Sequence, residues 1–174
     1  LFFLRRAKNF LPNKALITLY FSLFHCHLLY CPIILSTTNQ SNITKISAMQ
    51  RKAIRTITNS KRTASTTEIF KDLQILPFQD IITYSKAMFM HSIEYGYNPA
   101  FADTWTHNNQ RNPDLNLRNG NDFQLPQVKK ESFRKSTLYS LPQAWNNIGD
   151  VKFQTNRTTF KINLLYNLFE GLGS

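Results

Sequence analysis

Residues 42–58 read NITKISAMQRKAIRTIT, and the spacing of their side chains predicts an amphipathic α-helix. At about 3.6 residues per turn, four isoleucines and Ala53 share one face, whereas the lysines and arginines share the opposite face. Such a helix packs its isoleucines into a core and leaves its cations in solvent. The stretch therefore predicts a mainly α-helical fold with a basic outer surface.

The basic face has no acidic neighbours on its N-terminal side. The 174 residues include 21 Lys and Arg against 10 Asp and Glu, a net charge of +11, and the first acidic residue is Glu68. A solvated helix face normally mixes both signs of charge, so an unmixed one favours contact with phosphate groups. The nucleic-acid-binding residues predicted here are Lys45, Arg51, Lys52, Arg55, Lys61 and Arg62.

A second segment, residues 15–35, contains no Lys, Arg, Asp or Glu. Its length and basic N-terminal flank raise the possibility of a membrane span, which its histidines, Tyr20 and Pro32 argue against. Leu16, Tyr20, Leu23 and His27 recur at the spacing of a helix buried on one side. A core helix is favoured, and a membrane span stays open as the alternative.

The sequence offers little for enzymatic chemistry. Without acids, the first third excludes a two-metal centre, a calcium loop and a glycosidase carboxylate pair. Five glycines form no phosphate-binding loop, and His25, Cys26 and His27 cannot share one helix face as zinc ligands. We expect no metal, no cofactor and no catalytic residue. Two cysteines without a disulfide framework favour a reducing, intracellular compartment, cytoplasm or nucleus.

Composition changes after Tyr97 and divides the chain into two expected regions. Residues 1–97 form a helical region of about four helices, and residues 98–174 a C-terminal extension. Within the extension, residues 98–128 are rich in asparagine and predict a loop or extended segment, with a short strand over 123–128. Residues 129–174 predict further helices, with a kink or break at Pro142. A second basic patch consists of Lys129, Lys130, Arg134 and Lys135.

Five strings in series resemble a known family. They are LPNKALITLYFSLFHCHLLY (11–30), SNITKISAMQRKAIRTITNSKRTASTTEIFKDLQILPFQDI (41–81), FMHSI (89–93), RNPDLNLRNGNDFQLP (111–126) and LPQAWNN (141–147). Their order and spacing resemble the region after the polymerase core in reverse transcriptases of non-LTR retrotransposons, jockey-like and related elements. The resemblance covers roughly residues 3 to 165.

The resemblance implies a helical thumb followed by a C-terminal extension, from an RNA-directed DNA polymerase. The catalytic aspartates and their divalent metals would belong to a polymerase palm upstream of Leu1, so this part should be inactive alone. Its partners would be that palm and the RNA and DNA of a template-primer, with no small-molecule substrate. Cys31 and Leu35 stand where relatives often carry Gly and Trp, and the cysteine-histidine knuckle of some relatives is absent.

The sequence therefore predicts a non-catalytic fragment that holds template-primer through backbone contacts. Two other interpretations stay open at this point. One is a small basic protein anchored in a membrane through residues 15–35, although a membrane partner is not favoured. The other is a non-functional relic of a retrotransposon, which the departures from the family pattern favour.

Overall fold

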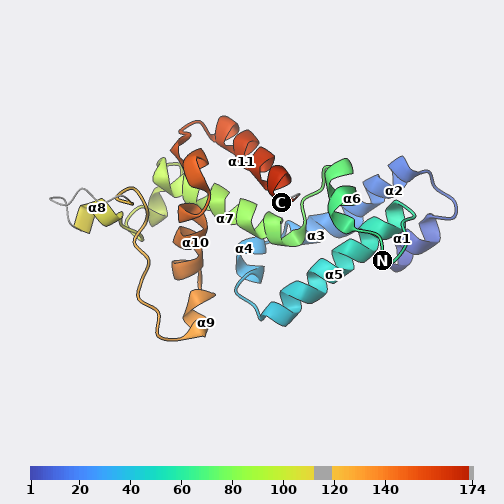
Figure 1. The fold of residues 1–174 in the computed structure, drawn as a ribbon, viewed down its shortest axis with the longest axis horizontal. Coiled ribbons are helices and arrows are strands. Elements are labelled where there is room, and N and C mark those ends of the chain that lie inside the picture. Colours follow the sequence, from blue (N-terminus) through green and yellow to red (C-terminus); the bar gives the residue numbers. More distant parts are fainter. Residues whose placement is uncertain (112–118, 173–174) are drawn as a thin grey trace. The chain divides into compact units, whose positions relative to one another are not determined.

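A computed structural model describes residues 1–111 and 119–172 of the chain. The structure is mainly helical, as predicted (Figure 1), with 66% of residues in helices. Among the described residues, the only strand-like pairing is one bridge between His107 and Phe123. The predicted strand over 123–128 is therefore not formed. Residues 112–118, inside the predicted 98–128 loop, lie outside the described part.

The chain divides into two compact units. Unit 1 comprises Leu1–Ile82 together with the segment that starts at Asn167, and unit 2 comprises Thr83–Tyr166. Both divisions fall inside helices, α7 (Phe78–Glu94) and α11 (Arg157–Gly171), each of which contributes residues to both units. The change of composition after Tyr97 lies within unit 2.

Unit 1 is built from short helices around one longer helix, α5 (Gln40–Ile57). As the pattern over 42–58 predicts, the isoleucine face of α5 is turned to the core, and its lysines and arginines lie on the other side. Asn39 is the N-cap of the helix. The core of the unit includes Leu4, Leu16, Tyr20 and Ile54. The other α-helices that lie wholly within the unit are α1 (Phe2–Ala7), α2 (Asn13–Tyr20), α3 (Cys26–Leu28), α4 (Pro32–Leu35) and α6 (Thr66–Asp72).

The apolar segment 15–35 is not one continuous α-helix. A π-helical turn, Phe21–His25, follows α2, and Cys31 (φ 50°) separates α3 from α4. The π-turn adds one residue per turn, so the buried face continues at Leu28 and not at the predicted His27. Leu23, predicted inside, is 51% exposed for the same reason. Pro32 disfavours the right-handed helical conformation for Cys31 and thereby ends the run.

Membrane crossing is not indicated by these helices. Within residues 1–111 and 119–172, no helix combines the length and the apolar composition that a membrane crossing requires.

A buried amide joins three segments of unit 1. The Gln50 side chain donates from Nε2 to the Tyr20 hydroxyl (3.1 Å) and to the Leu76 carbonyl (2.9 Å). Its Oε1 accepts from the Phe78 N–H (2.7 Å), which is the first N–H of α7 and has no partner within that helix. Burial raises the pKa of Tyr20 to about 12, so the phenol keeps its proton at neutral pH. Gln50 thus fixes α5 against α2 and against the start of α7.

Unit 2 is built around the rest of α7 and an aromatic cluster. The buried His91 ring lies 4.3 Å from the Phe160 ring and 6.3 Å from the Trp145 ring, between centroids. Trp145 lies on α10 (Thr137–Asn146) and Phe160 on α11 (Arg157–Gly171). The shorter helical elements of the unit are Pro99–Phe101, α8 (Asn108–Arg111), α9 (Glu131–Arg134) and Gly149–Phe153.

Helix α10 continues through Pro142, where the sequence predicts a kink or a break. Proline lacks the N–H that the carbonyl four residues earlier, that of Leu138, would accept in a regular helix. The Trp105 indole donates to this carbonyl instead (Nε1 to O, 3.0 Å). A side chain from the asparagine-rich region therefore satisfies the acceptor that Pro142 leaves free.

The Gln50 network predicts a stability effect in unit 1. Replacing Gln50 by leucine should lower the free energy of unfolding by about 2–4 kcal/mol, because the Leu76 carbonyl and the Phe78 N–H lose a buried partner. Urea unfolding followed by circular dichroism measures the change. Gln40→Leu, at the exposed start of the same helix, is the control and should stay within about 0.5 kcal/mol of the parent. Equal stabilities of the two variants would contradict the role of Gln50.

Candidate nucleic-acid interface

A basic pocket of about 610 Å³ lies in unit 1, between the C-terminal ends of α1 and α5 and the turn that follows α5. Asn9, Thr56 and Ser60 contribute polar atoms to its wall. The five charged residues that line it are all cations: Arg5, Lys8, Lys52, Arg55 and Arg62.

The turn that follows α5 forms part of the pocket wall. Asn59 adopts a left-handed conformation (φ 55°), and the Ser60 N–H donates to the Arg55 carbonyl (3.1 Å), which closes a Schellman-type cap. The Arg55 guanidinium donates twice to the Ala64 carbonyl, from Nη2 at 2.9 Å and from Nε at 3.3 Å. The chain therefore folds back after α5 and brings Ser60 and Arg62 to the pocket.

A contact between distant parts of the sequence joins α1 to this turn. The ammonium group of Lys8 donates to the side-chain oxygen of Asn59. Helix α1 is also held by Leu4, whose side chain is buried in the core of unit 1. Tertiary packing thus places Arg5 and Lys8 beside Lys52 and Arg55, although the two pairs lie far apart in the sequence.

The charge of the pocket is largely uncompensated. A helix C-terminus carries at most about half a negative charge, so the ends of α1 and α5 together offset about one of the five cations. Among the described residues, every salt bridge lies in unit 2: Glu94 with His107, Glu131 with Arg134, and Asp122 with Lys152. Such a pocket attracts anions, above all ligands that carry several negative charges.

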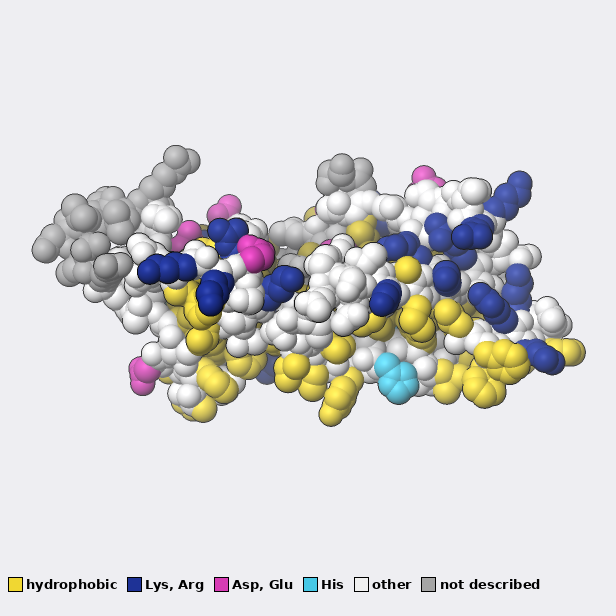
Figure 2. Space-filling view, turned by 90° about the horizontal axis from the view of Figure 1, so that it is seen from below, with side chains coloured by type: hydrophobic (Ala, Val, Ile, Leu, Met, Phe, Trp, Pro, Cys, Tyr) yellow, Lys and Arg dark blue, Asp and Glu magenta, His cyan; other side chains and the backbone are white. Residues whose placement is uncertain are grey.

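The space-filling view shows the same distribution over unit 1. Figure 2 shows Lys and Arg side chains gathered over this unit, on the right, with apolar side chains along one edge below them. Exposed apolar residues of the unit's N-terminal part include Phe2, Phe10 and Tyr30.

The pocket contains some of the predicted binding residues. Lys52, Arg55 and Arg62 line it. Lys45, Arg51 and Lys61 belong to the same unit but do not line it. Lys129, Lys130, Arg134 and Lys135 lie in unit 2, where Arg134 Nε is 3.7 Å from an oxygen of Glu131.

Sequence reasoning did not assign Arg5 and Lys8 to the site. Both precede the first acidic residue, which is the one sequence signal that points to them. Their spacing from α5 carries no such signal, because the side chains that meet are Lys8 and Asn59, 51 residues apart.

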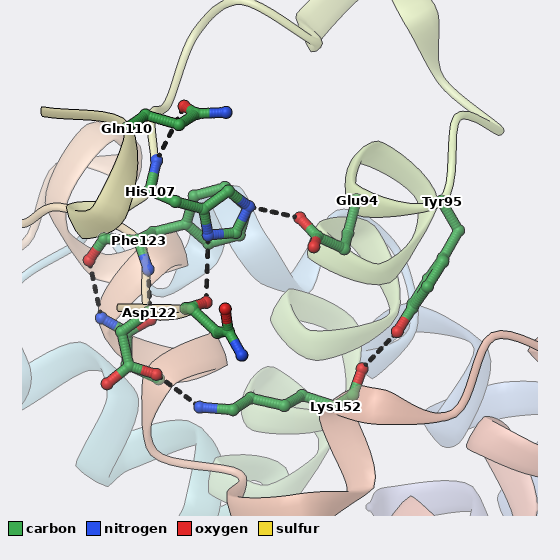
Figure 3. Close-up of polar contacts among 9 residues, drawn as sticks. Glu94, Tyr95, His107, Gln110, Asp122, Phe123 and Lys152 are labelled. Carbon is green, nitrogen blue, oxygen red and sulfur yellow. Dashed lines mark hydrogen bonds and ion pairs between the residues drawn. The ribbon is translucent and has the colours of Figure 1, made fainter. Parts of the chain in front are cut away.

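Unit 2 holds a second polar cluster, in which the charges are paired (Figure 3). His107 lies between the Glu94 carboxylate (Nε2 to Oε2, 3.0 Å) and the Asn121 carbonyl (Nδ1 to O, 3.0 Å). Both partners only accept hydrogen bonds, so the site suits the charged imidazolium form, which donates from both nitrogens. The hydrogen bond that His107 donates to Glu94 raises the pKa of His107, although burial opposes the shift.

The same cluster includes a second ion pair and borders a pocket of about 600 Å³. The Lys152 ammonium donates to Asp122, and the Tyr95 hydroxyl donates to the Lys152 carbonyl (2.8 Å). Because each of these charges has its counterion, this pocket offers no excess charge to a ligand. The cluster ties the asparagine-rich region to the end of α7.

Metal binding finds no support in the described part of the chain. No group of three or more His, Cys, Asp or Glu side chains is arranged there to hold an ion. Cys26 and Cys31 are both free thiols at the surface.

The histidines of unit 2 predict opposite pH dependences of stability. The pKa of His107 is raised above 6.5, so its stabilisation is present below that pH and is lost as the pH rises through the folded pKa. Burial lowers the pKa of His91, whose Nε2 donates to the Gln154 carbonyl (2.9 Å) and whose Nδ1 has no partner among the described residues. Stability is therefore lost as the pH falls below 6.5, because the unfolded chain takes up that proton first.

Urea unfolding between about pH 5 and pH 8 measures both effects. The stability advantage of the parent over His107→Gln should shrink toward high pH. The advantage of the parent over His91→Phe should shrink toward low pH. Parallel curves for the parent and a variant would contradict the state assigned to that histidine.

Comparisons of the chain with family models, with curated proteins and with solved structures found no match.

Proposed function

We propose that unit 1 binds the sugar-phosphate backbone of nucleic acid through its basic pocket. The observation that carries this proposal is the collection of five cations, without an acidic residue, on the wall of one pocket. Three of them are arginines, whose planar guanidinium groups match the oxygens of phosphate in pairs.

The number and arrangement of the cations favour a polymer over a small anion. A single phosphate group cannot contact at once five cations that come from α1, α5 and the turn after α5. A nucleic-acid strand offers a row of phosphates at regular spacing, and backbone contacts of this kind hold it without selecting a sequence. The side chains of Lys8 and Arg55 donate to Asn59 and Ala64, whereas those of Arg5, Lys52 and Arg62 make no hydrogen bond within the described part of the chain and are available for such contacts.

The resemblance to reverse transcriptases of non-LTR retrotransposons suggests the natural ligand, an RNA and DNA template-primer. On this proposal the chain is a non-catalytic part of an RNA-directed DNA polymerase. It positions the strand, and a palm of the same parent chain performs the chemistry. The acid-free first 67 residues are consistent with a binding role, because they contain no carboxylate that would repel phosphate.

Removal of three pocket cations tests the proposal. The triple variant Arg5→Gln, Lys52→Gln, Arg62→Gln should bind a labelled RNA–DNA hybrid at least about tenfold more weakly. The slope of log affinity against log salt concentration should fall by about 2 to 3, because three phosphate contacts are lost. Fluorescence anisotropy over a series of salt concentrations measures both quantities. Arg55 is left in place, because its bonds to Ala64 support the turn.

A matched variant separates the pocket from net charge alone. Lys14→Gln, Lys71→Gln, Lys161→Gln removes the same charge at positions that do not line the pocket. It should keep most of the affinity and most of the salt slope. Equal losses in the two triple variants would show that binding follows net charge, and the pocket would then have no special role.

A further inference from the structure

Two exposed aromatic residues flank, along the sequence, the segment of α1 and the following turn that lines the basic pocket. Phe2 is 65% exposed and belongs to α1, and Phe10 is 84% exposed and follows Asn9 in the turn after that helix. Arg5, Lys8 and Asn9 from the same segment line the pocket. Cations and exposed aromatic rings therefore share one short segment of unit 1.

Phe2 shares a face of α1 with Arg5, a residue that lines the pocket. Residues three or four apart share a face of a helix, so Phe2 lies one turn before Arg5 on the same side. Leu4 and Ala7 occupy the other side and pack into the core. The guanidinium of Arg6 lies 5.3 Å from the centre of the Phe2 ring, which keeps a positive charge beside an aromatic face.

The surface formed by the pocket cations together with Phe2 and Phe10 indicates, by its chemistry, which ligand covers it. Its ligand must be anionic, because the cations have no acidic partners, and it must also offer flat apolar faces to the rings. In a duplex the bases stack on one another inside the helix, and their faces are not available to a protein. Unpaired nucleotides offer both a phosphate backbone and free base faces, and proteins bind them by combining a basic groove with aromatic rings.

We propose that the pocket holds an unpaired strand of nucleic acid, with its phosphates among the five cations and its bases stacked on Phe2 and Phe10. This inference rests on the proposed function and narrows it from nucleic acid in general to single-stranded segments. In a template-primer, these are the nucleotides outside the paired region.

Stacking is tested by removing the rings and the bases separately. The full chain and its variant Phe2→Ala, Phe10→Ala are titrated into a labelled single-stranded oligonucleotide, and into one of equal length whose nucleotides lack bases. The variant should bind the normal strand about 5- to 150-fold more weakly for each stacked base. It should bind the abasic strand as tightly as the parent does, because the charges are unchanged.

Two further variants guard against indirect effects. Phe10→Trp supplies a larger ring and should keep the affinity for the normal strand. Phe153→Ala removes a ring of unit 2 that is 53% exposed and should leave binding unchanged. Circular dichroism spectra that match the parent show that the fold is kept.

Other outcomes overturn the inference in distinct ways. Equal losses on the normal and abasic strands, or tighter binding of a duplex than of either of its strands, would show that the rings do not stack on bases. Ring-dependent binding to vesicles that contain anionic phospholipid, without base-dependent binding to oligonucleotides, would show that Phe2 and Phe10 contact a membrane surface and not bases. If the triple charge variant also binds as the parent does, the proposed function itself fails.

Discussion

Unit 1 depends on the buried side-chain amide of Gln50. Its three hydrogen bonds reach Tyr20, Leu76 and Phe78, which belong to α2, to the connection before α7, and to the first turn of α7. Leaving this buried amide without partners would cost free energy, and the three hydrogen bonds therefore hold α5 in one orientation about its axis. The isoleucine side of α5 then faces the core, and Lys52 lies on the exposed side.

The two units use charge in opposite ways. In unit 2, Glu94 pairs with His107 and Asp122 with Lys152, so that the ion pairs hold a segment with few apolar residues against the end of α7. In unit 1, the cations of the pocket have one another as neighbours. Their contacts are with neutral oxygens, such as those of Asn59 and Ala64, which fix the position of a cation but do not neutralise it. Pairing stabilises the fold of unit 2, whereas the open charge of unit 1 is available to a ligand.

Periodicity in the sequence predicts the local part of this arrangement. The helix over 42–58 and its basic face follow from residues that are neighbours on one helix, and this spacing predicts Lys52 and Arg55 as binding residues. The pocket needs the close approach of Lys8 and Asn59 and the left-handed turn at Asn59, which no helical period encodes. The same holds for the continuity of α10, where the Trp105 indole replaces the N–H that Pro142 lacks. Contacts between distant residues decide both of these points, whereas the π-helical turn after α2 is a local departure from the helical period.

A cluster of like charges opposes folding, and this cost bears on function. Most proteins place both signs on a surface, and natural sequences break local rules of this kind mainly at functional sites. The repulsion among Arg5, Lys8, Lys52, Arg55 and Arg62 is present in the free chain and is relieved when an anion enters the pocket. A ligand that binds only the folded state also stabilises it in proportion to its concentration over its dissociation constant. On the proposed function, the feature that weakens unit 1 when it is free is therefore the one through which a polyanion stabilises it.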